Sequence, residues 1–232
     1  MSRVNLRSDM KVDLVDSMGG DESVARAARV SHLNDGDATR GLEGLIGYLM
    51  KHKHGTPFET VVLQYRIEAP IFVARELMRQ RIASWNEASA RYTELPGEFW
   101  VPSPTRDVVQ TTSASRPEFA YDEHVLVEAE NRLSNAYDAA YREYKNMLAA
   151  GVAREVARAA LPVGVYTRMY LTLNLRSLLN MLEVRTHLPG VSANRSYPQH
   201  EAEEVALLLE AHARGVAPLV LAAFDANGRV AP

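Results

Sequence analysis

The amino-acid sequence predicts an α+β fold, and three features indicate it. Helix-forming residues dominate the 232 positions, which include only 13 glycines and 11 prolines. Three separated segments alternate apolar and polar residues as half-buried strands do, whereas most of the rest repeats apolar residues at helical spacing. With 47% hydrophobic residues the chain can bury a substantial core, so we expect one domain over residues 1–232.

The first third of the chain is predicted to hold a strand and two helices. Residues 4–16 alternate in part and form the opening strand, and a short helix follows from Asp21, where acidic residues lie at its positive end. Thr39 is a candidate cap for a second helix, whose apolar residues recur at helical spacing up to Leu49. A polar turn over residues 51–58 ends this region.

The middle of the chain is predicted to form a strand, a helix and an irregular stretch. Residues 61–69 alternate and are closed by Pro70, which also suits the first turn of a helix with an apolar stripe up to Met78. An arginine-rich segment, residues 79–92, therefore leaves a helix C-terminus. Residues 96–117 are rich in Pro, Ser and Thr and are expected to be irregular.

The last half is predicted to be mainly helical. A long helix spans about residues 117–151 and stops at Gly151. The remaining elements are a short helix over 153–161, a strand over 167–174, a helix over 175–187, a loop over 190–198, and a helix over 201–224 interrupted near Gly215 and Pro218.

Composition excludes several classes of function. A formal net charge of −3 argues against a general nucleic-acid binder. The absence of cysteine excludes disulfides, thiolate metal sites and cysteine nucleophiles. The seven histidines form no His-Glu-x-x-His pattern, and we expect no metal site. Residues 1–10 lack the apolar core of a signal peptide and no apolar run has membrane-spanning length, so a cytoplasmic protein is expected.

Four polar groups are candidates for binding or catalysis. The first, residues 79–92, combines three arginines with Glu87 and the stacking faces of Trp85 and Tyr92, which suits an anionic, hydrogen-bonding ligand. The second pairs Arg154 and Arg158 on one helix face. The third is the turn over residues 52–59. Solvated charges, a surface ion pair and a plain turn are the respective alternatives.

The fourth group lies on the helix predicted over residues 175–187. Asn174 is placed to cap that helix, while Arg176, Asn180 and Arg185 lie near one stripe, beside the leucines of the core stripe. These polar residues either line a cleft or face solvent.

Taken in their order along the chain, the four groups resemble the motifs of the flavin-dependent thymidylate synthase family. Its signature is Arg-His-Arg, seven residues and Ser, and Arg79-Gln80-Arg81 with Ser89 fits except at the central position. Residues 52–59, 153–162 and 174–185 match its other motifs, and the similarity runs over about residues 24–210. The resemblance implies a mixed or antiparallel sheet packed with helices, with one long central helix.

The resemblance also implies ligands and site residues. It implies a homotetramer with active sites between subunits that binds FAD, dUMP, methylenetetrahydrofolate and NADPH. The residues expected to contact FAD are Ser31, His54, Thr56, Arg79, Gln80, Arg81, Glu87, Asn174, Arg176 and Asn180. Those expected to bind dUMP are Glu76, Arg79, Glu87, Ala88, Ser89, Arg91, Arg158 and Arg185. Arg185 would face the uracil and favour its N3-deprotonated form.

The implied reaction is methylation of dUMP at C5, and it fits a chain without the cysteine that activates uracil in the classical enzyme. Ser89 would then be a ligand rather than a nucleophile. Gln80, Thr60 and a longer segment over residues 186–197 depart from the family pattern. Alternatives are therefore methyl or hydroxymethyl transfer to another pyrimidine nucleotide, and a non-catalytic flavin or nucleotide binder; a nucleic-acid module is a distant third.

Overall fold

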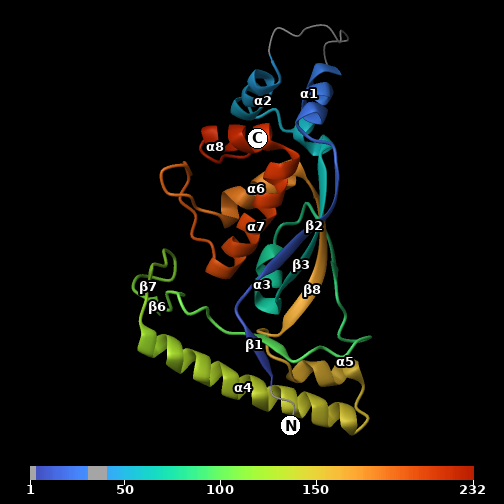
Figure 1. Cartoon of the computed structure of the whole chain (residues 1–232), viewed down its shortest axis with the longest axis vertical. Helices are drawn as coiled ribbons and strands as arrows, with labels where there is room; N and C mark the ends of the chain where they lie inside the picture. Colours follow the sequence, from blue (N-terminus) through green and yellow to red (C-terminus); the bar gives the residue numbers. More distant parts are fainter. Residues whose placement is uncertain (1–3, 31–40) are drawn as a thin grey trace. The chain divides into compact units, whose positions relative to one another are not determined.

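The computed structural model describes residues 4–30 and 41–232, and it confirms the α+β prediction (Figure 1). The chain folds into two compact units, each assembled from three stretches of sequence. Of the described residues, the first unit comprises 4–10, 68–76 and 87–168, and the second comprises 11–30, 41–67, 77–86 and 169–232. A single domain over residues 1–232 stays a prediction. No helix within the described ranges combines the length and hydropathy needed to cross a membrane.

The second unit contains most of a four-stranded sheet with helices packed on it. The strand order is β2-β3-β8-β4, and β3 and β8 contribute residues to both units. Its elements are β2 (Lys11–Met18), α1 (Asp21–Arg29), α2 (Leu42–Lys51), the 3-10 helix η2 (Thr56–Thr60), β3 (Val62–Pro70), β4 (Ser84–Glu87), β8 (Tyr166–Asn174), α6 (Leu175–Arg185), α7 (His200–Val216) and α8 (Pro218–Ala226).

Helix α7 lies against β2 and β3, and buried polar groups on those strands form hydrogen bonds with it. The hydroxyl of Tyr65 donates to the Leu209 carbonyl at 3.1 Å, and a ring nitrogen of His212 lies 3.0 Å from the Val12 carbonyl. Burial raises the pKa of the Tyr65 hydroxyl. Asp21 accepts from the first free amides of α8, including that of Val220 at 3.0 Å, and so caps that helix from α1.

The first unit is built around the long helix α4 (Glu123–Ala149) and an aromatic core. Asp122 caps α4 by accepting from the amides of His124 and Val125, and Gly151 follows its end at φ +83°. Phe99 stacks on Tyr137 with ring centroids 4.7 Å apart. The remaining elements are a parallel pair, β1 (Asn5–Arg7) with β5 (Glu98–Trp100), an antiparallel pair, β6 (Val109–Gln110) with β7 (Phe119–Ala120), and α3 (Ile71–Leu77), α5 (Arg154–Ala157) and the 3-10 helix η3 (Arg158–Ala160).

Several predicted boundaries were wrong. Residues 4–16 hold two strands rather than one, and α4 begins six residues late because Asp122 caps it. The stretch 96–117 contains β5 and β6, and β4 was not predicted because it is short and polar. The interruption of the last helix is confirmed at Ala217. The proposed cap Thr39 lies outside the described residues; Gly41 precedes α2.

Candidate active site

Helix α6 has one buried apolar face and one polar face. Asn174 caps it, its side-chain oxygen accepting from the Ser177 amide at 2.8 Å. Arg176 and Asn180 lie one turn apart on the polar face, and the side chain of Asn180 donates to the Arg176 carbonyl at 2.9 Å. Leu175, Leu178, Leu179 and Leu182 are buried. The buried leucine stripe is thus confirmed, with Arg176 and Asn180 on the polar side. Arg185 lies about half a turn round the helix from Arg176, so the three polar residues do not share one stripe.

The turn over residues 54–59 lies against α6 through Arg176. One guanidinium nitrogen of Arg176 pairs with the Glu59 carboxylate at 2.7 Å. A Cβ at Gly55 would lie 2.4 Å from Arg176 Nε, so only glycine permits this approach. His54 and Thr56, on either side of Gly55, are exposed. The second unit therefore brings the turn over residues 54–59 and helix α6 together.

Gln80 connects the arginine-rich segment to the same helix. Its side-chain amide donates to the Ser177 carbonyl at 3.0 Å, and its own carbonyl accepts from the Trp85 indole at 3.4 Å. The neighbouring Arg79 and Arg81 are exposed. The residue that departs from the family signature is thus a structural link between the segment and α6.

In the first unit, the segment after β4 lies along β8. The Ala88 amide donates to the Arg168 carbonyl at 2.8 Å, and Ser89 Oγ accepts from the Arg91 amide at 3.3 Å. Arg91 pairs with Glu155 of α5 at 3.0 Å, and both side chains are about half exposed. Arg158, three residues after Glu155, is exposed.

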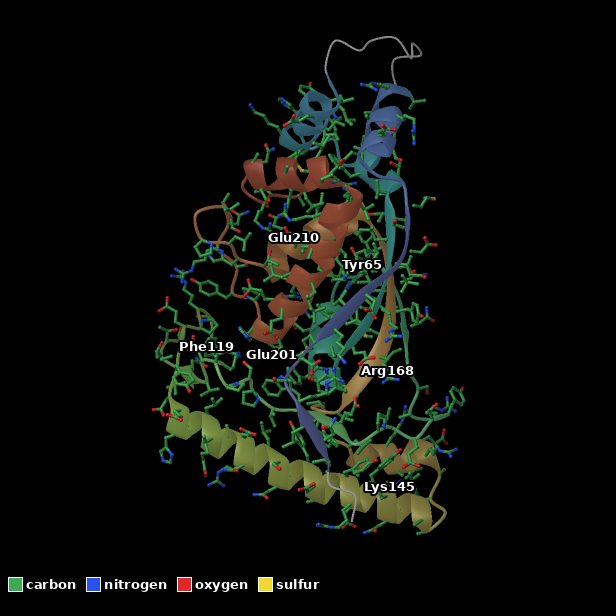
Figure 2. All side chains as sticks on the ribbon, in the orientation of Figure 1. Tyr65, Phe119, Lys145, Arg168, Glu201 and Glu210 are labelled. Atoms are coloured by element: carbon green, nitrogen blue, oxygen red, sulfur yellow. The ribbon has the colours of Figure 1, made fainter. Side chains whose placement is uncertain are left out.

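A cavity of about 120 Å³ in the first unit is lined by Ala88 and Ser89. Its other lining residues are Glu68, Thr93, Glu94, Leu95, Pro96, Glu98, Tyr166, Thr167 and Arg168. Figure 2 labels Arg168 on β8; its Nε lies 3.2 Å from the Glu68 carboxylate. Sequence reasoning missed this charged lining, because Glu68, Glu98 and Arg168 come from β3, β5 and β8, Glu94 precedes β5, and no local spacing connects them.

Arg7 neutralises much of the negative charge in that lining. It contacts Glu98 at 3.1 Å and Glu68 at 3.5 Å, and its guanidinium lies 4.3 Å from the centroid of the Tyr166 ring. A hydrogen bond to Asp9 raises the pKa of Arg7, so it stays charged.

The predicted site residues divide between the two units. The second unit carries His54, Thr56, Arg79, Gln80, Arg81, Asn174, Arg176, Asn180 and Arg185. The first carries Glu76, Glu87, Ala88, Ser89, Arg91 and Arg158. Ser31 lies outside the described residues. In the second unit, contacts bring together the turn around Gly55, Gln80 and helix α6, each part of a predicted motif. In the first unit, Ser89 contacts Arg91.

Comparison with known proteins identifies the family. The family model described as thymidylate synthase complementing protein matches residues 13–219. A flavin-dependent thymidylate synthase of Streptomyces coelicolor is 44% identical, covering 99% of this chain and 96% of the relative. One of Tropheryma whipplei is also 44% identical, covering 97% and 96%. The chain therefore belongs to the flavin-dependent thymidylate synthase family, and the prediction of a flavin-dependent enzyme of this family is confirmed.

Solved structures of a related methylase are also similar. The UMP/dUMP methylase PolB from Streptomyces cacaoi, bound with 5-Br UMP, superposes with a TM-score of 0.93 at 41% identity and covers 100% of both chains. The same protein bound with 5-Br dUMP gives a TM-score of 0.89 at 42% identity, covering 99% of this chain and 100% of the other. The fold of this chain is thus the fold of that methylase.

Proposed function

We propose that this chain methylates dUMP at C5 to give dTMP, with methylenetetrahydrofolate as the one-carbon donor and NADPH as the reductant. The observation that carries the proposal is the convergence, on helix α6, of the turn around Gly55 and of Gln80. These segments are far apart in the sequence, and each carries one of the family's motifs.

The residues of the second unit suit an FAD. Arg176 supplies a guanidinium that matches phosphate oxygens, and Asn180, Thr56 and His54 add hydrogen-bonding groups around it. The missing Cβ at Gly55 leaves the turn in close approach to Arg176. We assign to FAD the ten residues predicted from the family, Ser31 included. When bound, the reduced flavin supplies a hydride, a reaction that no side chain of this chain can provide.

The nucleotide is assigned to the arginines and to the segment after β4. Arg79, Arg91 and Arg158 are exposed and suit its phosphate, with Ser89 as a hydrogen-bonding ligand. Arg91 must exchange Glu155 for phosphate, and this exchange is inexpensive because an exposed ion pair contributes only about 0–1 kcal/mol. Arg185 faces the uracil and stabilises negative charge on N3, which increases the nucleophilicity of C5.

Four subunits are proposed to share the sites. Large apolar side chains stand exposed beside the predicted ligand residues: Ile82 is 70% exposed and Tyr92 is 75% exposed. They adjoin Arg81 and Arg91 in the sequence, and contact with a neighbouring subunit would remove them from water. Native mass spectrometry of the flavin-loaded protein measures the assembly directly. A cytoplasmic location also stays a prediction.

UMP is a second candidate substrate. The observation that favours it is the 41% identity, over the whole chain, to a methylase of both UMP and dUMP. The departures at Gln80 and Thr60 keep open a hydroxymethylated product or another pyrimidine nucleotide, as the sequence suggested.

Mass spectrometry of the nucleotide product tests the proposal. The protein is incubated with methylenetetrahydrofolate, FAD and NADPH, and with either dUMP or UMP. We expect a methylated nucleotide that is lost when FAD is omitted. Methylation of both dUMP and UMP would extend the substrate class to both sugars. A hydroxymethylated product, or none despite bound flavin, would contradict C5 methylation.

A further inference from the structure

A buried arginine lies close to the end of helix α6. Arg229 is 2% exposed, and its guanidinium contacts both carboxylate oxygens of Glu210, at 2.9 and 2.7 Å. It also contacts Asp225 at 2.7 Å. Glu210 lies on α7 (Figure 2) and is itself buried. The backbone of Arg229 has φ +56°, a conformation that residues other than glycine rarely adopt.

The charge of Arg229 is preserved in this environment. Burial by itself lowers the pKa of the guanidinium, but the hydrogen bonds and charges of Glu210 and Asp225 outweigh it and the pKa is raised. A buried ion pair is expensive to form in a low-dielectric interior and contributes little net stability. Stability alone therefore does not explain this cluster.

The fourth contact of Arg229 reaches the residue that follows the predicted catalytic arginine. Its Nη2 donates to Thr186 Oγ1 at 2.8 Å. The same hydroxyl donates to the Leu182 carbonyl at 2.6 Å, and the Thr186 carbonyl accepts from Ser196 Oγ at 2.8 Å. The Thr186 amide donates to Leu182 as well, at 3.0 Å. Every hydrogen-bonding group of Thr186 is thus engaged.

The segment around Arg229 contacts α6 at further points. The Ala231 amide donates to Glu183 at 3.0 Å, and Arg176 Nε donates to the Pro232 carbonyl at 3.1 Å. In the loop after α6, the Ala193 amide donates to the Gly228 carbonyl at 2.8 Å. Residues 228–232 therefore hold both ends of the helix that carries Arg176 and Arg185.

We propose that Arg229 is a positioning residue for Arg185. Through Thr186 it fixes the backbone at the point where the helix ends, and so fixes the direction in which the Arg185 side chain leaves the helix. The inference rests on the proposed role of Arg185 at the uracil. A charge that is aligned before the reaction stabilises developing negative charge without reorganisation. A displacement of about 1 Å of such a group can cost about a hundredfold in rate.

The alternative is that the cluster only stabilises the fold, and Arg214 supplies the matched control. Arg214 donates to the same two carboxylates, including Asp225 at 2.6 Å, but no contact between Arg214 and Thr186 occurs in the described structure. Losing Arg214 disturbs the ion cluster and leaves the bond to Thr186 in place. The two arginines thus separate stabilisation from positioning.

The experiment compares Thr186→Val, Thr186→Ser, Arg229→Met and Arg214→Met in the flavin-loaded enzyme. The probe is 5-fluoro-dUMP, whose ring ionises at N3 more readily than uracil and changes its ultraviolet absorption when it does. Bound probe reports the ionised fraction, and steady-state assays give kcat and KM. We expect Thr186→Val and Arg229→Met to lower the ionised fraction and to lower kcat about 10–100-fold, with KM nearly constant. Thr186→Ser and Arg214→Met should resemble the parent enzyme.

Unchanged kcat and unchanged ionisation in folded Arg229→Met and Thr186→Val would overturn the inference, even if both melt earlier. If Arg229→Met does not fold, the comparison of Thr186→Val with Thr186→Ser decides. Arg185→Ala separates the two proposals. Ionisation in the parent enzyme that is lost in Arg185→Ala supports the role of Arg185, whatever the Arg229 variants do. Ionisation that survives in Arg185→Ala removes that role, and the positioning inference with it.

Discussion

The two regions that carry most of the predicted site differ in how strongly their own fold fixes them. Residues 174–187 are held in place by the Asn174 cap and by the hydrogen bonds of Thr186, all of whose polar groups have partners. Residues 79–91 instead place Arg79, Arg81 and Arg91 on the surface, and the side chain of Gln80 links this segment to α6.

This difference separates two tasks of a binding site. Groups that must stabilise charge in a transition state act best when they are held in place beforehand, which describes α6. Groups that capture a phosphate can remain solvated until the ligand orders them, at the expense of side-chain entropy. The exposed arginines also stand where a neighbouring subunit is proposed to complete the site. We therefore expect substitutions on α6 to affect kcat and those at residues 79–91 to affect KM.

The largest effect should come from Arg185→Ala. Without the guanidinium opposite the uracil, we expect turnover to fall by about a thousandfold or more, with FAD and the assembly retained. Stopped assays of product formation, together with the flavin absorbance of the purified variant, measure both. Arg195→Ala removes another arginine of the second unit and is the control, expected to keep its activity. A normal rate in Arg185→Ala would exclude its assigned role.

The next effect should come from Arg91→Ala. Loss of a charge-assisted contact to phosphate should raise KM for dUMP about 10–100-fold, because such a bond contributes about 1.5–3 kcal/mol. Thermal stability should hardly change, since the pair with Glu155 is exposed. Glu155→Gln is the matched control and should leave KM unchanged or lower it. Equal KM increases in both variants would mean that the ion pair, not the phosphate contact, matters.

A smaller effect is expected for Gly55→Ala. The new Cβ would lie 2.4 Å from Arg176 Nε and displace that side chain from Glu59. We expect FAD to bind about tenfold more weakly, which corresponds to about 1.4 kcal/mol. Flavin fluorescence titration measures the affinity. Gly47→Ala is the control, because a Cβ there meets nothing within 4 Å and lies in helix α2. Unchanged affinity in Gly55→Ala would count against Arg176 as an FAD ligand.

The smallest effect should come from Gln80→His. An imidazole N–H can replace the amide that donates to the Ser177 carbonyl, so we expect activity within about threefold of the parent or above it. A steady-state assay is sufficient. A clear loss would show that the surroundings are adapted to the amide. Gln80→Leu, which removes the donor, should lose more activity than Gln80→His.

The elements that could be predicted are those that local sequence patterns specify. Helical spacing and the Asn174 cap located α6, and polar composition located the turn at residues 51–58. Long-range contacts left no local signal: Arg229 meets Thr186 across 43 residues, and Gln80 meets Ser177 across 97. β4 was missed because it has only four residues, three of them polar, and only pairing within the sheet defines it.

Release of tritium from 5-tritiated dUMP tests the central claim most directly, because C5 methylation must remove the hydrogen at that carbon. With methylenetetrahydrofolate, NADPH and FAD present, we predict tritium in water in an amount equal to the dTMP formed, and none in Arg185→Ala or without FAD. Methylated product without tritium release, or release that needs no flavin, would contradict the account.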